Sequence, residues 1–206
     1  MTTVVYSAVY GDFDRPLAQP VPVRLFTEAT HPTTFADPRM AAKWWKLHPE
    51  LAAPDADVTI WIDGNVEIRD PRFSEYALAE LGDDDAVFTR HPDRDDLADE
   101  VAISLHLGKY DGQDISGQVG AYLAAGHPPH WGLAHGAILV RRNNERVRAF
   151  DAAWWEEICR WSMQDQLSLA HLMRTLPLRW HWFRRSPLDL GWVRRGFHRA
   201  PDEWRP

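Results

Sequence analysis

The sequence predicts an α/β fold, in which helices cover both faces of a mostly parallel sheet. The 206 residues suit a single domain with a sizeable core, so we expect one domain over 1–206. Short apolar runs rich in β-branched residues alternate with longer segments whose apolar residues recur at helical spacing. This alternation is typical of sheets whose parallel strands are joined by helices.

Each predicted strand is a short apolar run bounded by turn residues. The first run closes at a turn-rich segment that begins with Gly11, and the run Val58–Ile62 closes abruptly at Asp63-Gly64-Asn65. The predicted strands span 3–10, 23–26, 58–62, 86–89, 137–140 and 179–183.

Start signals and apolar spacing define the predicted helices. Asp37-Pro38 and Asp70-Pro71 each place an acid at the N-cap and a proline in the first turn. The segment 95–107 carries apolar residues at helical spacing, namely Leu97, Val101 and Leu105. The predicted helices span 37–47, 71–81, 95–107, 115–125, 147–161 and a last segment from a cap at Ser162 to about 173. Residues 184–206 are expected to form a C-terminal tail that folds over the site.

Charge and composition argue against several functions. The formal net charge of −7 argues against general nucleic-acid binding, which needs a basic face. Cys159 is the single cysteine, so no internal disulfide can form and a cytoplasmic location is expected. The chain enters a strand-like run at once, and no apolar stretch approaches the roughly 20 residues of a membrane-spanning helix. We therefore expect neither secretion nor a membrane span.

The most informative motif is the polar triplet after the strand Val58–Ile62. Ligands of open α/β sheets bind at the carboxyl ends of strands. Asp63 and Asn65 place oxygen donors there, which suits a hard divalent cation, Mn²⁺ or Mg²⁺, that carries a diphosphate. The triplet is similar to the Asp-x-Asp motif of nucleotide-sugar glycosyltransferases, with Asn65 in the second acidic position. The alternative is a structural turn, because Asp-Gly-Asn is also a good turn sequence.

A set of motifs in order resembles the domain-of-unknown-function 616 family, which includes plant mucilage-related glycosyltransferase-like proteins. The resemblance covers roughly residues 3 to 175, and it rests on the motifs together. They are Val4-Val5-Tyr6-Ser7-Ala8-Val9-Tyr10-Gly11-Asp12-Phe13-Asp14, Lys43-Trp44-Trp45-Lys46-Leu47-His48-Pro49, Trp61-Ile62-Asp63-Gly64-Asn65, Arg90-His91-Pro92, Gly132-Leu133 and Asp165-Gln166-Leu167-Ser168. The resemblance implies a GT-A-like fold, in which a Rossmann-like sheet binds a nucleotide sugar, usually with a divalent metal. It also implies His198 as a third metal ligand, because some GT-A enzymes complete the metal site with a histidine near the carboxyl terminus.

On this resemblance, residues near the strand ends and on one helix take roles in donor binding. The first strand ends where the nucleotide base is expected, although turn chemistry alone also explains the residues that follow it. Two lysines on the 37–47 helix share a face, from which they would reach phosphates or ribose; the alternative is a solvated stripe. The expected nucleotide-binding residues are Tyr10, Gly11, Asp14, Lys43, Lys46 and Asp63.

The expected catalytic residues are Asp165, Gln166 and His91. Asp165 opens a helix, where the helix dipole favours a carboxylate whatever its task. In an inverting transfer it would be the general base for an acceptor hydroxyl, and in a retaining one it would position the donor sugar. Gln166 would hydrogen-bond the sugar, and His91 would contact the acceptor or the diphosphate. The expected acceptor-binding residues are Trp131 and His135.

The expected function is transfer of a sugar from a nucleotide-diphosphate donor to a glycan or small-molecule acceptor. One alternative is a metal-dependent hydrolase of an amide or lipid substrate, with a metal-held water near Asp63 and His91; no GxSxG-like nucleophile is present. Another alternative is a catalytically inactive nucleotide-sugar-binding module, for which Asn65 in place of an acid is mild support.

Overall fold

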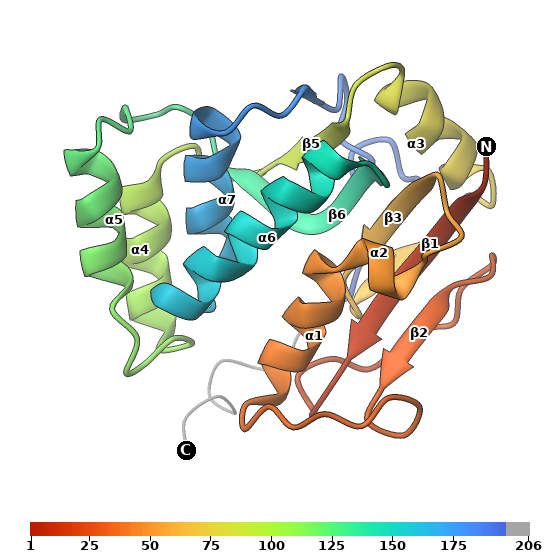
Figure 1. Cartoon of the computed structure of the whole chain (residues 1–206), viewed down its shortest axis with the longest axis horizontal. Helices are drawn as coiled ribbons and strands as arrows, with labels where there is room; N and C mark the ends of the chain where they lie inside the picture. Colours follow the sequence, from red (N-terminus) through yellow and green to blue (C-terminus); the bar gives the residue numbers. More distant parts are fainter. Residues whose placement is uncertain (197–206) are drawn as a thin grey trace.

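The computed structural model describes residues 1–196, and a six-stranded sheet runs through its centre in the order β2-β1-β3-β6-β5-β7 (Figure 1). The bounds are β1 Thr3–Val9, β2 Arg24–Thr27, β3 Val58–Ile62, β5 Ala86–Arg90, β6 Ala134–Arg142 and β7 Trp180–Trp182. The pairs β1–β2, β1–β3 and β5–β7 are parallel, whereas β6 is antiparallel to both of its neighbours, β3 and β5. The predicted α/β class with a mostly parallel sheet is confirmed.

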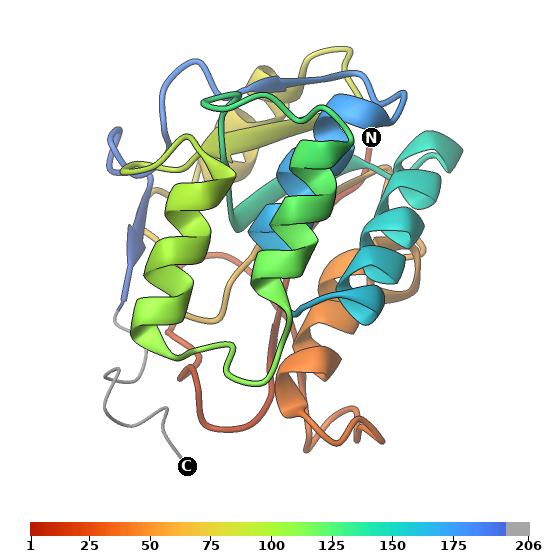
Figure 2. The same ribbon diagram turned by 90° about the vertical axis from the view of Figure 1, so that its left-hand side faces the viewer.

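Helices cover both faces of this sheet, as the sequence predicts. On one face, α1 (Pro38–Leu47), α6 (Glu145–Arg160) and α7 (Asp165–Thr175) enclose one core cluster with the sheet. On the other face, α3 (Phe73–Leu81) encloses a second cluster. The remaining helices are α2 (Pro49–Ala52), α4 (Leu97–Leu107) and α5 (Ile115–Ala124). Figure 2 shows α4 and α5 side by side, and with α7 they bury a third cluster. Within residues 1–196, no helix has both the length and the apolarity to cross a bilayer.

Several elements differ from the sequence prediction. Strand β6 extends beyond the predicted 137–140 at both ends. A short antiparallel ribbon, β4 (Val66–Ile68) with β8 (Val193–Arg195), was not predicted, and β8 lies in the expected tail. Both strands have three residues, which is too short for an alternating pattern to be recognised. The short helix α2 was not predicted either, and it begins at Pro49, where the missing N–H is tolerated.

Helix α4 is present where predicted, but its apolar residues do not all face the core. Leu105 is 55% exposed and Ile103 is 40% exposed. Glu100 and Ser104 are buried instead, on the same side of the helix as Leu97. The spacing of apolar residues therefore identified the helix but not the side that it buries.

A buried ion pair lies beneath the carboxyl end of α1. The Arg141 and Asp151 side chains are each 1% exposed and are joined at 2.7 Å. Arg141 also donates to the Tyr6 hydroxyl at 2.8 Å and to the Lys46 carbonyl at 2.7 Å. Tyr6 donates to the same carbonyl, so β1 and β6 together fix the backbone of Lys46.

Replacing Arg141 with methionine is expected to lower the free energy of unfolding by about 3–5 kcal/mol, because the buried Asp151 would lose its counter-charge. Burial already raises the pKa of Asp151 to about 7, and removing the guanidinium should raise this pKa further. The pKa of an aspartate in the unfolded chain is about 3.9. The destabilisation of the variant relative to the wild type should therefore grow as pH rises above the folded-state pKa of Asp151. Urea titrations at neutral and alkaline pH measure this dependence. Arg160→Met, at an exposed position of α6, is the control, and equal losses in both variants would contradict the prediction.

Candidate active site

A cavity of about 440 Å³ opens at the carboxyl ends of β1 and β3. Ala8 and Val9 of β1 and Trp61 of β3 form part of its wall. Strand β6 runs in the opposite direction, so it contributes His135 and Gly136 from near its amino end. Helices α1, α4 and α7 add polar side chains to the lining, among them Lys46, Glu100 and Asp165. This is the edge of the sheet at which the sequence predicts the ligand.

Four charged side chains from three separate regions meet in this cavity. The Lys46 ammonium lies 2.7 Å from Asp165 Oδ2 and 3.7 Å from Asp63 Oδ1. The Lys43 ammonium lies 3.1 Å from the same Asp165 oxygen. All four were predicted as site residues, and we call them the charged cluster: Lys43, Lys46, Asp63 and Asp165.

Local structure explains how the charged cluster forms. Asp37 caps α1 by accepting from the Arg39 amide, and the helix then presents Lys43 and Lys46 on one face. Gly136 leaves room for them, since a Cβ there would lie 3.0 Å from Lys46 Nζ. Asp165 is in the first turn of α7, where the helix dipole also favours its ionised form.

The charges in the cluster control one another's ionisation. Burial would raise the pKa of Asp165, but the two ammonium groups and their hydrogen bonds hold this pKa well below its usual range. Burial lowers the pKa of Lys43, and Asp165 offsets this effect only in part. For Lys46, two carboxylates outweigh burial and raise the pKa above its ordinary value. Lys46 is therefore the more firmly charged of the two lysines.

Asp63 faces the cavity and also begins a turn. Trp61 Nε1 donates to Asp63 Oδ1 at 2.8 Å, and the Asp63 carbonyl accepts from the Val66 amide. Burial works against ionisation, but the neighbouring Lys46 charge keeps the pKa of Asp63 below its ordinary value. Gly64 is required at the next position, because a Cβ would lie 2.5 Å from Val9 Cγ2. The triplet Asp63-Gly64-Asn65 therefore forms a turn and also places the Asp63 carboxylate at the cavity.

Of the three predicted metal ligands, Asp63 lines the cavity and Asn65 does not. Asn65 is 3% exposed, donates to the Gly196 carbonyl at 3.2 Å and does not line the cavity. His198 lies outside the described residues, and within residues 1–196 no group of three His, Cys, Asp or Glu side chains could hold an ion. Mg²⁺ is commonly held by one or two carboxylates and the phosphates of a substrate. Asp63 fits that pattern by its position, and the metal requirement stays a prediction.

The other predicted site residues divide into two groups. Tyr10, Asp14, His91, His135 and Gln166 line the cavity, and Gly11 and Trp131 do not. Gly11 has a φ of 65°, and a Cβ there would lie 2.9 Å from Pro38, so it serves the turn after β1. Trp131 packs against the core clusters. The acceptor-binding role predicted for Trp131 therefore has no support from its position.

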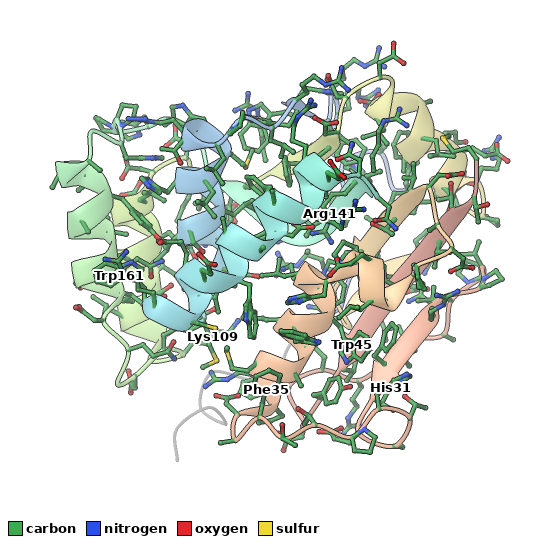
Figure 3. The ribbon with its side chains drawn as sticks, in the orientation of Figure 1. His31, Phe35, Trp45, Lys109, Arg141 and Trp161 are labelled. Carbon is green, nitrogen blue, oxygen red and sulfur yellow. The ribbon has the colours of Figure 1, made fainter. Side chains whose placement is uncertain are left out.

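The residues on the cavity wall have defined polar surroundings. Tyr10 accepts from Trp45 Nε1 at 2.8 Å and donates to the His31 carbonyl at 2.8 Å; Figure 3 labels Trp45 beside α1 and His31 near the end of β2. Burial, assisted by Arg94, lowers the pKa of His91 to about 4. Burial and the Arg195 charge lower the pKa of His135 to about 4. Both imidazoles are therefore neutral at physiological pH.

Sequence reasoning missed several residues of the cavity wall. Gln164 directly precedes the predicted Asp165 and Arg94 lies three residues after the predicted His91, so proximity in the chain was the available signal for these two. Arg195 also lines the cavity, and it comes from β8, which the sequence did not predict. The missed polar residues are Arg39, Asp93, Arg94, Glu100, Ser104, Lys109, Tyr110 and Gln164.

Comparisons with known proteins show which family the chain belongs to. A family model described as TOD1/MUCI70, glycosyltransferase-like domain matches residues 24–184. The chain is 28% identical over 189 residues to the probable hexosyltransferase MUCI70 of Arabidopsis thaliana, covering 84% of this chain and 32% of that protein. Among solved structures, the apo structure of the bifunctional glycosyltransferase WbbM is similar, with a TM-score of 0.49 and 14% identity over 81% of this chain and 29% of that one. The chain thus spans about a third of the length of each relative.

Proposed function

Because this chain belongs to the family of TOD1/MUCI70 glycosyltransferase-like domains, we propose that it transfers a sugar from a nucleotide-diphosphate donor to a glycan or small-molecule acceptor. The observation that carries the proposal is the charged cluster at the carboxyl end of β3, inside a cavity of about 440 Å³. The domain-of-unknown-function 616 resemblance, we propose, refers to the same family.

The chemistry of this transfer requires stabilisation of the departing diphosphate. Negative charge gathers on the diphosphate as the glycosidic bond breaks, and fixed cations in a water-poor site stabilise it most effectively. Lys46 and Lys43 supply two ammonium groups that Asp165 holds in position. Lys109 and Arg195 also line the cavity and extend its cationic wall.

Asp165 suits a positioning role better than the role of a general base. A base is most effective when its pKa lies near the working pH, whereas two ammonium groups keep the pKa of Asp165 well below its usual range. We propose that Asp165 orients the lysines and, with Gln166, the donor sugar. His135 is a neutral group that can accept a hydrogen bond from an acceptor hydroxyl, whereas both ring nitrogens of His91 already face N–H groups of Asp93 and Arg94.

A divalent cation is part of the proposal, with Asp63 as its protein ligand. Mn²⁺ or Mg²⁺ would act as a Lewis acid toward the diphosphate. The amide of Asn65 contacts Gly196, so we propose that it supports the loop beside the cation. The roles proposed above for Lys43, Lys46, Asp165 and Gln166 are carried by the side chains of these residues.

The proposal predicts that a nucleotide-diphosphate sugar raises the melting temperature of the protein. A ligand that binds only the folded state at about 100 times its Kd adds about 2.7 kcal/mol of stability. Thermal shift with UDP- and GDP-sugars, with and without Mn²⁺, measures this effect, and release of nucleoside diphosphate reports turnover. Asp63→Ala should abolish the Mn²⁺-dependent part of the shift. Asp57→Ala, at the other end of β3, is the matched control and should leave it intact.

The outcomes separate the candidate functions. Failure of every nucleotide and nucleotide sugar to shift the melting temperature would overturn the proposal. Binding without release of nucleoside diphosphate, over a broad set of acceptors, would identify an inactive binding module. Release of fatty acid from a lipid amide would identify a hydrolase instead.

A further inference from the structure

Helix α4 buries two polar side chains at the cavity and leaves a leucine in solvent. Glu100 and Ser104 line the cavity and are each 4% exposed, whereas Leu105 does not line it and is 55% exposed. Burying a carboxylate while leaving leucine in water is unfavourable for folding alone. Local choices that oppose the fold are concentrated at functional sites. The orientation of α4 therefore indicates a role for its buried polar side.

The buried polar side of α4 is part of a continuous hydrogen-bonded wall. Gln164 Nε2 donates to Glu100 Oε1 at 2.6 Å and to Ser104 Oγ at 3.1 Å. Tyr110 donates to Gln164 Oε1 at 3.1 Å. All four side chains are buried and line the cavity, and we call them the polar wall: Glu100, Ser104, Tyr110 and Gln164.

The polar wall adjoins the charged cluster. Gln164 directly precedes Asp165, so the two groups meet at one point of the chain. On the far side, Arg94 Nε donates to Glu100 Oε2 at 2.6 Å. The cavity is thus divided into a part that suits phosphates and a part that suits hydroxyl groups.

We propose that the polar wall binds the hydroxyl groups of an uncharged hexose on the donor, with Glu100 as the residue that determines specificity. This inference rests on the proposed function. Carboxylate and hydroxyl oxygens arranged on rigid elements accept hydrogen bonds from sugar hydroxyls with defined geometry.

The charges around the wall favour an uncharged sugar over a uronic acid. A carboxylate on the sugar would lie close to Glu100 and near Asp165, and like charges at short range are repulsive. Arg94 is the adjacent cation, but its Nε is engaged by Glu100 and its NH2 lies 2.9 Å from His91 Nε2. Burial raises the pKa of Glu100 against the opposing Arg94 charge, as expected for a carboxyl group in a confined site. Besides Arg94 and Asp165, the titratable groups that interact with Glu100 are Lys109 and Tyr110.

Calorimetric titration of the full chain with UDP, GDP, UDP-glucose, UDP-galactose, GDP-mannose and UDP-glucuronate tests the inference. We expect the wild-type protein to bind a hexose donor at least about tenfold more tightly than UDP-glucuronate. This is the difference in affinity that the loss of one hydrogen bond to a charged group, or one repulsive charge contact, produces. Glu100→Gln should weaken hexose-donor binding about tenfold and change the affinity for the matching nucleoside diphosphate by less than about twofold. Ser104→Ala should weaken hexose-donor binding less, and Leu105→Gln, on the exposed side of α4, should have no effect.

Several results would overturn the inference. Equal affinity for UDP-glucose and UDP-glucuronate would exclude selection for an uncharged sugar. If Glu100→Gln binds the hexose donor as tightly as the wild type does, Glu100 is a scaffold residue. The same conclusion follows if the substitution weakens the binding of UDP and of UDP-glucose equally. Should Glu100→Gln fail to fold, Ser104→Ala is judged by the same criteria. A wild-type protein that binds no nucleotide at all would instead overturn the proposed function, and this inference with it.

Discussion

Replacing Asp165 with asparagine is expected to lower the free energy of unfolding by about 3–5 kcal/mol and to reduce the transfer rate by about 10²-fold. The variant keeps the shape of the side chain but leaves Lys43 and Lys46 without the charge that holds both ammonium groups. Denaturant titration measures the first effect and release of nucleoside diphosphate measures the second. Glu145→Gln is the control, because Glu145 is an exposed acid in the first turn of α6. Glu145→Gln should lower the free energy of unfolding by no more than about 1 kcal/mol.

The effect of Asp165→Asn should also depend on pH in a defined direction. The pKa of Asp165 is lowered by folding, so its ionised form stabilises the protein fully above the unfolded pKa of about 3.9. This contribution is lost as pH falls toward the folded pKa. The stability difference between wild type and variant should therefore be constant near neutral pH and shrink below about pH 4. A difference that grows on acidification would contradict the assigned ionisation.

Replacing Lys46 with methionine should cause the largest loss of activity, with a fall in kcat of about 10²- to 10³-fold. Lys46 is the cation that contacts both carboxylates of the cluster, and its loss leaves Asp63 without its counter-charge. The affinity for nucleoside diphosphate should fall in parallel, which calorimetric titration measures. Lys43→Met, which removes a contact to Asp165 alone, should lose less. If Lys46→Met binds nucleoside diphosphate as tightly as the wild type does, the phosphates do not bind at Lys46.

The charged cluster could be predicted because its residues lie at element ends or share a helix face. The carboxyl end of a strand fixes the position of Asp63, and the spacing of Lys43 and Lys46 fixes a common helical face. Asp165 is 119 residues from Lys46, yet it begins a helix that returns to the same edge of the sheet. Rules for strands and helices therefore sufficed for these four residues.

The polar wall could not be predicted because it depends on which side of a helix faces inward. Glu100 and Ser104 are ordinary surface residues by pattern, and only the packing of α4 on its neighbours buries them. The amino end of β6 was missed for a related reason. Ala134 and Gly136 have low strand propensity, and pairing with β5, which includes an irregularity between Phe88 and Thr89, extends the strand.

The antiparallel strand β6 has a consequence for how the chain folds. It separates β3 from β5 in the sheet, although those two strands are encoded well before it. During synthesis, β3 and β5 therefore each present an unpaired edge until residues 134–142 leave the ribosome and join them. The sheet is therefore completed by a late, non-local pairing, the kind of contact that slows folding and prolongs the exposure of unpaired strand edges.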